Sequence, residues 1–229
     1  ATLGMPIAPP SYFADLRALC DQHGALLILD EVQSGLGRTG TEWAIEHWRG
    51  PVQDGAGVAP DNLVTGTGLS GGVYPIAATC YRAELNQFMH DNPFIHISTF
   101  GGAEVGCTVA LTVLGLTADP SFLQRTNELA ERFASGFQHL MARYPDTLVG
   151  TRQLGLMIGL LFPDETCGPL MTKLLYEEGV LAIYANNDQR VLQFLPPLIM
   201  NDLEAEKTLA ALDRALATQS RLRGWRIIH

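Results

Sequence analysis

Apolar positions near the start of the chain follow a helical period and then a strand pattern. From Phe13 to Cys20, apolar residues recur at three- and four-residue spacing, which predicts a helix that ends at Gly24. After one further residue comes the uninterrupted apolar run 26–29, which predicts a buried strand. A helix, a short turn and a buried strand make one step of an α/β sheet, so we expect an α/β fold.

The same patterns predict the next elements along the chain. They are strands over 62–66 and 76–81, helices over 42–48, 82–89 and 103–116, and a loop over 50–60. Asp119 and Pro120 then predict the start of a long helix, because Asp suits the cap and Pro the first turn. One face of this helix carries an apolar stripe formed by Phe122, Leu129, Phe133, Phe137 and Leu140.

Beyond Pro145 the pattern changes to short strands and helices. Strands are expected over 147–149, 156–162, 180–184 and 191–195, and helices over 166–178 and 202–217. Asn201 with Glu204 resembles a capping box at the start of the last helix. This α+β texture predicts a second domain, so we expect domains at 1–118 and 119–229, with a weakly determined tail over 220–229.

Composition narrows the possible partners. The 229 residues are 47% hydrophobic, enough for one large domain or two smaller ones. A net charge of −9 and the lack of a basic run argue against nucleic acid and anionic membranes, and no apolar run is long enough to cross a bilayer. The four cysteines lie far apart, without metal-binding spacing. We therefore expect a reduced cytoplasmic protein with small buried thiols and no metal site.

Glycine-rich loops follow three of the predicted elements and are the candidate sites. Ligands of an open α/β sheet bind at the carboxyl ends of its strands, where Asp30 would stand. Asp30 could cap a loop or face a cationic ligand. Ser98 and Thr99, next to two glycines and before a helix, could hold a phosphate or cap that helix.

The three loops together resemble the class III aminotransferases, pyridoxal-phosphate (PLP) enzymes of fold type I, and are nearest to the putrescine and ornithine aminotransferases. The similar segments are LLILDEVQSGLGRTG, PDNLVTGTGLSGGVYPIA and NPFIHISTFGGAEVG. The resemblance covers about residues 9–217. It implies the C-terminal part of the large PLP-binding domain followed by a small α+β C-terminal domain. The family's first half normally supplies a phosphate-binding loop and an aromatic residue stacked on the cofactor ring.

The resemblance also implies roles for single residues. Asp30 matches the aspartate that pairs with the pyridinium nitrogen, Val32 the residue packed on the ring face, and Gln33 the residue near the ring hydroxyl. Thr99, with Ser98 beside it, matches the threonine that reaches the phosphate of the neighbouring subunit's cofactor. The site would then be shared within a homo- or hetero-oligomer, in which another chain supplies the N-terminal half.

Three positions depart from the family pattern. The lysine that forms a Schiff base with PLP would stand at position 67, where this chain has Thr67, and threonine has no amine. The carboxylate-binding arginine would fall at Gln193, and an asparagine at Ala103. One Lys→Thr change could be deliberate inactivation, whereas three departures resemble natural drift. Without that arginine, a small amine lacking an α-carboxylate is the better candidate substrate.

Three hypotheses follow. In the first, the chain carries half of a PLP site, holds PLP noncovalently or not at all, and does not transaminate alone, so that it is a pseudoenzyme working with a partner chain. In the second, it belongs to a working transaminase of an amine or ω-amino substrate, and the lysine was mutated or comes from another chain. In the third, the fold serves PLP-independent catalysis or binding.

Overall fold

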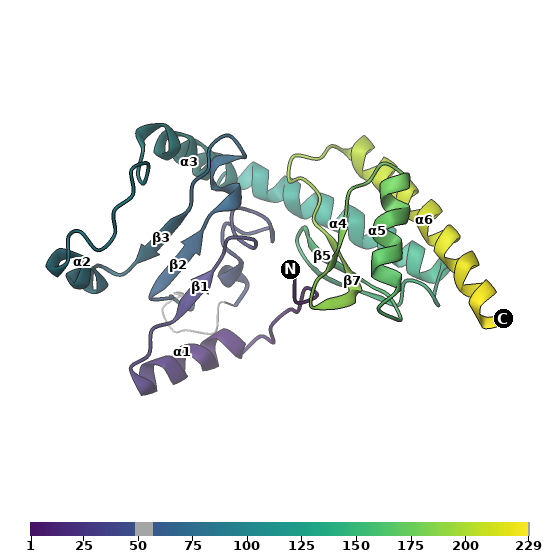
Figure 1. Cartoon of the computed structure of the whole chain (residues 1–229), viewed down its shortest axis with the longest axis horizontal. Helices are drawn as coiled ribbons and strands as arrows, with labels where there is room; N and C mark the ends of the chain where they lie inside the picture. The colour runs from purple at the N-terminus through teal and green to yellow at the C-terminus, as the bar shows by residue number, and fades with distance from the viewer. Residues whose placement is uncertain (49–56, 229) are drawn as a thin grey trace. The chain divides into compact units, whose positions relative to one another are not determined.

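The computed structural model describes residues 1–48 and 57–228, with side chains up to residue 222. Most of the loop predicted over 50–60 therefore lies outside the described residues. The chain forms two compact units (Figure 1). The N-terminal unit is Ala8–Leu123, and the C-terminal unit combines Gln124–His229 with Ala1–Ile7.

The N-terminal unit is built on a three-stranded sheet in the order β1-β2-β3. Strands β1 (Ile28–Asp30) and β2 (Asn62–Thr65) run parallel, and β3 (Ala78–Tyr81) is antiparallel to β2. The helices are α1 (Tyr12–His23), α2 (Gln87–Asp91) and α3 (Glu104–Thr117), with short 3-10 turns η1 (Ala44–Trp48), η2 (Thr67–Ser70) and η3 (Ala83–Asn86). The predicted order of helices and strands is thus confirmed.

Glycine ends α1 where the sequence predicted. Gly24 takes the left-handed conformation, with φ of 61°, and its N–H closes the last turn of the helix. An ion-pair cluster then fixes α1 on the sheet. Its centre is Asp61, just before β2, whose side chain is 2% exposed. Asp61 Oδ2 lies 2.8 Å from Arg17 Nη1 of α1, and Asp61 Oδ1 lies 2.6 Å from Arg82 Nη2. Asp61 also accepts the Leu27 N–H at 2.6 Å. This cluster sets the approach of the chain to β1.

The prediction of a buried strand over 26–29 is wrong in two respects. The strand is Ile28–Asp30, and the Ile28 side chain is 57% exposed, whereas Leu27 is buried. The physical reason is that β1 is an edge strand of a small sheet. An apolar run shows that a strand can be buried on both faces, but not which neighbours the chain itself supplies.

The C-terminal unit packs helices on a four-stranded antiparallel sheet in the order β4-β5-β7-β6. The strands are β4 (Gly150–Leu154), β5 (Met157–Leu161), β6 (Ile183–Ala185) and β7 (Asp188–Phe194), and the helices are α4 (Pro120–Arg143), α5 (Cys167–Glu177) and α6 (Asp202–Ile228). Four residues of the predicted stripe on α4 are buried: Leu129, Phe133, Phe137 and Leu140. Phe122 is only partly buried.

The capping signals predicted at the starts of α4 and α6 are both confirmed. Asp119 accepts hydrogen bonds from the Ser121 N–H and hydroxyl at 2.7 and 2.6 Å. Asn201 and Glu204 form the reciprocal capping box, with both bonds at 2.9 Å. The strand predicted over 147–149 instead begins at Gly150, and α6 continues past 217 to Ile228.

The unit boundary falls after Leu123, and residues Ala1–Ile7 join the C-terminal unit rather than the N-terminal one. Asn187 donates its N–H to the Thr2 carbonyl at 3.0 Å, and Met5 is 3% exposed. The sequence carries no signal for this contact, because it depends on residues far apart in the chain. The domains predicted at 1–118 and 119–229 remain a prediction.

The thiols depart from the expectation that all are buried: Cys167 is buried, Cys20 and Cys107 are partly buried, and Cys80 is exposed. Within residues 1–48 and 57–228, no single helix is long and apolar enough to cross a membrane, and only α3 and α4 taken together meet that criterion.

Candidate functional site

The carboxyl ends of the parallel strands β1 and β2 bring two predicted residues to one edge of the sheet. Asp30, the last residue of β1, is in register with Val64 of β2. Thr67 follows Val64 by three residues, as the first residue of η2. The Glu31 N–H donates to the Val64 carbonyl at 2.8 Å, so strand pairing continues one residue beyond Asp30. Both Asp30 and Thr67 are exposed at this edge.

Asp30 makes the loop cap that the sequence left open as one alternative, and its other oxygen stays accessible for a ligand. Oδ1 accepts the Val32 N–H at 2.9 Å. Oδ2 accepts no hydrogen bond, and Asp30 forms no ion pair, among the described residues. Val32 is partly buried and Gln33 exposed. The carboxylate therefore fits a cationic group such as a pyridinium nitrogen.

Thr67 sits in a strained backbone conformation. Its φ is +44°, a left-handed value that is rare for a β-branched residue. Gly71 and Gly72, with φ of 58° and 84°, complete the turn between η2 and β3. Strained residues of this kind cluster at binding sites. The Thr67 side chain cannot bond covalently to PLP as an amine would, so the residues at this edge fit a ring-nitrogen contact and do not fit covalent attachment.

The loop before α3 is closed by its own hydrogen bonds. Ser98 Oγ accepts the Gly101 N–H at 3.0 Å, and helix α3 begins at Glu104 with Ala103 in the cap position. Thr99 is exposed and does not cap the helix, so that alternative is wrong. The Thr99 hydroxyl is left available for a ligand or another chain.

Gln193 belongs to the C-terminal unit, in strand β7. Its side chain is 9% exposed, and Nε2 donates to the Tyr184 carbonyl of the neighbouring strand at 3.1 Å. The amide therefore ties β7 to β6. The role of Gln193 in substrate binding remains a prediction.

Sequence reasoning missed Glu31, the neighbour of Asp30. Glu31 is 3% exposed and accepts hydrogen bonds from the N–H groups of Ala44 and Ile45 and from the Ser34 hydroxyl. The only local signal was Ser34, three residues along the chain. The two backbone donors come from η1, whose approach to Glu31 is a tertiary feature.

Burial shifts the pKa values of Arg38 and Glu42, two residues of the loop between β1 and η1. It lowers the pKa of Arg38 to about 10, and it raises the pKa of Glu42, an effect that a hydrogen bond from the Thr117 hydroxyl opposes. In Asp61 the hydrogen bond from Arg17 is the main cause of a lowered pKa. The loop after Asp30 is thus packed into the N-terminal unit and is not a free surface segment.

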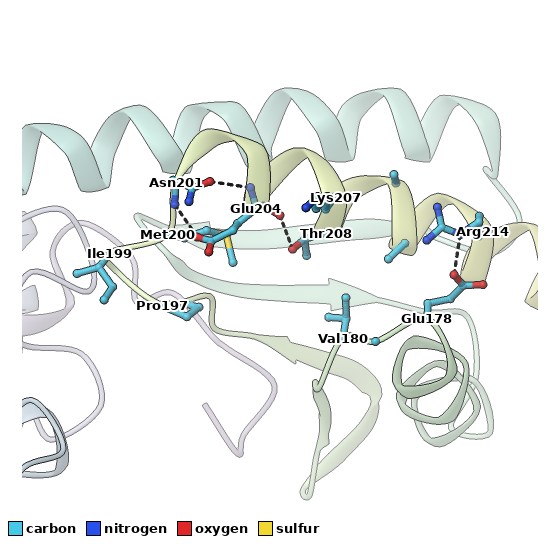
Figure 2. A pocket seen from close by; sticks show the side chains of 13 residues that line it. Glu178, Val180, Pro197, Ile199, Met200, Asn201, Glu204, Lys207, Thr208 and Arg214 are labelled. Atoms are coloured by element: carbon cyan, nitrogen blue, oxygen red, sulfur yellow. Dashed lines mark hydrogen bonds and ion pairs between the residues drawn. The ribbon is translucent and has the colours of Figure 1, made fainter.

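The two lysines of the sequence, Lys173 and Lys207, both belong to helices of the C-terminal unit. Lys173 on α5 is 72% exposed and 3.9 Å from Glu177. Lys207 on α6 lines a groove of about 780 Å³ whose apolar wall includes Val180 and Pro197 (Figure 2). All residues that line this groove belong to the C-terminal unit, and none of them is a predicted cofactor residue.

Comparisons with known proteins agree with the resemblance. A family model described as aminotransferase class III matches residues 1–216. An uncharacterized aminotransferase of Archaeoglobus fulgidus is 47% identical over 223 residues, which is 97% of this chain and 50% of that protein. The ornithine aminotransferase of Toxoplasma gondii matches with a TM-score of 0.83 and 28% identity, over 96% of this chain and 50% of that chain.

The N-acetylornithine aminotransferase of Stenotrophomonas maltophilia K279a matches with a TM-score of 0.77 and 28% identity, over 94% of this chain and 53% of that chain. The chain therefore spans about half the length of the relatives it matches and corresponds to their C-terminal part. The α/β fold is that of the fold type I aminotransferases.

Proposed function

The chain belongs to the class III aminotransferase family, and on this premise we propose that it carries half of a PLP site and does not transaminate on its own. One observation carries the proposal. Thr67 stands exposed at the carboxyl end of β2, where the family's Schiff-base lysine is expected. A threonine hydroxyl can neither attach the cofactor as an imine nor act as an amine base.

Asp30 is the residue that supports retention of the cofactor. PLP, when bound, supplies an electron sink that works best with a protonated ring nitrogen. The accessible Asp30 carboxylate would hold the proton at that nitrogen by charge and hydrogen bonding. Val32 and Gln33 would contact the ring, and the hydroxyls of Ser98 and Thr99 would donate to a phosphate.

A partner that completes the site is the second part of the proposal. The chain spans about half of its relatives, and large apolar side chains of the N-terminal unit remain exposed. Ile28 is 57%, Val105 64% and Leu111 70% exposed. Large apolar side chains that are exposed to water are available for packing against another chain. Their exposure supports a homo- or hetero-oligomer in which another chain supplies the N-terminal half. Separate thiols without metal spacing support a cytoplasmic location.

Equilibrium dialysis against PLP tests the cofactor proposal. We expect reversible binding by the wild type and a loss of about tenfold to a hundredfold in Asp30→Asn, because a charge-assisted hydrogen bond is removed. Asp15→Asn, an exposed aspartate of α1, is the matched control and should bind as the wild type does. Equal PLP affinities for wild type, Asp30→Asn and Asp15→Asn would refute the assignment of Asp30.

Borohydride reduction followed by mass spectrometry tests the statement about lysine. In the wild type we expect no PLP fixed to Lys173 or Lys207 at stoichiometric PLP. A fixed adduct on either lysine together with amino-group transfer would overturn the proposal.

A working transaminase is the alternative that the intact edge of the sheet favours. Asp30, Val32, Gln33 and Thr99 all keep the residue types expected of such a site. In this alternative, Thr67→Lys combined with the N-terminal half of a relative should fix PLP at position 67 and transfer amino groups from a small amine. Failure of both would exclude it. Finding no PLP in the purified protein, and no affinity for it, would instead favour reuse of the fold without the cofactor.

A further inference from the structure

Two adjacent acidic residues at the end of β1 have opposite environments. Asp30 is exposed, and only one of its oxygens is bonded, to the Val32 N–H. Glu31 is 3% exposed and has no ion-pair partner among the described residues. A buried carboxylate is costly unless donors surround it. The surroundings of Glu31 therefore indicate what this residue does.

Hydrogen-bond donors satisfy both oxygens of Glu31. Oε1 accepts the Ile45 N–H at 2.9 Å, and Oε2 accepts the Ala44 N–H at 3.2 Å together with the Ser34 hydroxyl. The two N–H groups belong to the first turn of η1, where backbone donors lack partners within the helix. Because all three groups point donors at Glu31, the site accepts an ionised carboxylate and does not suit an amide of the same shape.

The backbone around Glu31 is held as closely as its side chain. Its N–H donates to the Val64 carbonyl at 2.8 Å, and its carbonyl accepts the Gly35 N–H at 2.9 Å. A Cβ atom at Gly35 would lie 2.7 Å from the Trp43 ring and 2.9 Å from the Glu31 carbonyl oxygen, so only glycine fits there. Glu31 thus connects β1, β2 and η1 at one point.

We infer that Glu31 is a positioning residue, which holds the backbone between β1 and η1 so that the Asp30 carboxylate faces a ligand at the edge of the sheet. Asp30 is joined to Glu31 by one peptide bond, so any rotation of residue 31 tilts the Asp30 side chain. Val32, whose N–H bonds to Asp30, lies on the other side of Glu31. The inference rests on the proposed function only in naming PLP as that ligand.

The first test compares four variants of the full chain by nuclear magnetic resonance. In Glu31→Gln the amide group can face the Ser34 hydroxyl, but it then meets the Ala44 N–H, so we expect the Asp30 carboxyl and Val32 amide resonances to shift. Ser34→Ala removes one donor only and serves as the milder variant if Glu31→Gln does not fold. Glu84→Gln, an exposed glutamate of η3, is the matched control and should leave both resonances unchanged. Asp30→Asn identifies the Asp30 signals.

The second test measures PLP affinity in a double-mutant cycle. We expect Glu31→Gln to weaken binding about tenfold, and Asp30→Asn with Glu31→Gln to bind no worse than Asp30→Asn alone, because Glu31 acts only through Asp30. Additive losses of PLP affinity in the double variant would overturn the inference. Unchanged Asp30 and Val32 resonances in both Glu31→Gln and Ser34→Ala would also overturn it. If the wild type does not bind PLP, the proposed function fails, while the resonances still decide the role of Glu31.

Discussion

Thr67→Gly should stabilise the N-terminal unit, although it removes a side chain from a turn. Thr67 has φ of +44°, and its exposed hydroxyl makes no hydrogen bond within the described part of the chain. A left-handed conformation costs an L-residue about 1–2 kcal/mol, and glycine avoids this cost. Glycine loses about 0.5–1 kcal/mol more conformational entropy on folding. The net expectation is a gain of about 0.5–1 kcal/mol.

Urea denaturation measures this change. Trp225→Phe serves as the background, so that the two remaining tryptophans, Trp43 and Trp48, report on the N-terminal unit alone. With a slope of about 2 kcal/mol per molar urea, the midpoint should rise by about 0.3–0.5 M in Thr67→Gly.

The matched control for this prediction is Thr79→Gly. Thr79 is an exposed residue of β3, where the backbone is extended, so its replacement should lower the midpoint. If Thr67→Gly lowers the urea midpoint as much as Thr79→Gly does, the backbone of Thr67 is not strained, and the assignment of Thr67 as a strained site residue fails.

Two further predictions concern packing and pH. A Cβ atom at Gly106 would lie 2.8 Å from the Tyr74 ring, so Gly106→Ala should lower the free energy of unfolding by about 1–3 kcal/mol. Gly115 lies on the same helix with open space around it, so Gly115→Ala should raise the free energy of unfolding by about 0.5–1 kcal/mol. Equal urea midpoints for the two variants would contradict this prediction. The hydrogen bond from Arg17 lowers the pKa of Asp61 in the folded protein below its usual 3.8. The ionised Asp61 carboxylate therefore stabilises the fold fully above pH 3.8, and this stabilisation is lost as the pH falls through the pKa of Asp61 in the folded state. The acid limb of a stability–pH curve should therefore be shallower in Asp61→Asn, and an unchanged limb would contradict the role of Asp61.

Sequence patterns predicted those parts of the fold that depend on residues close together in the chain. The helix stop at Gly24, the Asp119 cap and the Asn201–Glu204 box are all local, and all were found. Strand β4 was misplaced because its sequence, GTRQL, is mostly polar and carries little apolar signal. The exposure of Ile28 was missed because burial depends on neighbours that periodicity does not identify.

In the candidate site, too, the sequence predicted the residues that depend on chain order and did not predict those that depend on tertiary contacts. Asp30 and Thr67 could be placed at one sheet edge from the order of loops and strands, and the register of β1 with β2 puts them there. Glu31 could not be recognised, because its donors Ala44 and Ile45 lie 13 and 14 residues away and meet it only after η1 packs on the loop. The same limit applies to Gln193, whose bond to Tyr184 depends on strand pairing.

At position 67, the turn sets the backbone conformation, and the side chain sets the chemistry. The Thr67 side chain makes no bond within the described residues that would hold φ at a left-handed value, so the turn itself imposes the conformation. Gly66 before it is extended, with φ of −179°, and Gly71 after η2 is left-handed, so glycines bracket the strained residue. A lysine at this position would meet the same backbone without the penalty of β-branching. The backbone at position 67 would therefore suit an amine-bearing side chain, and the proposal that this chain does not transaminate alone rests on the side chain present and not on the turn.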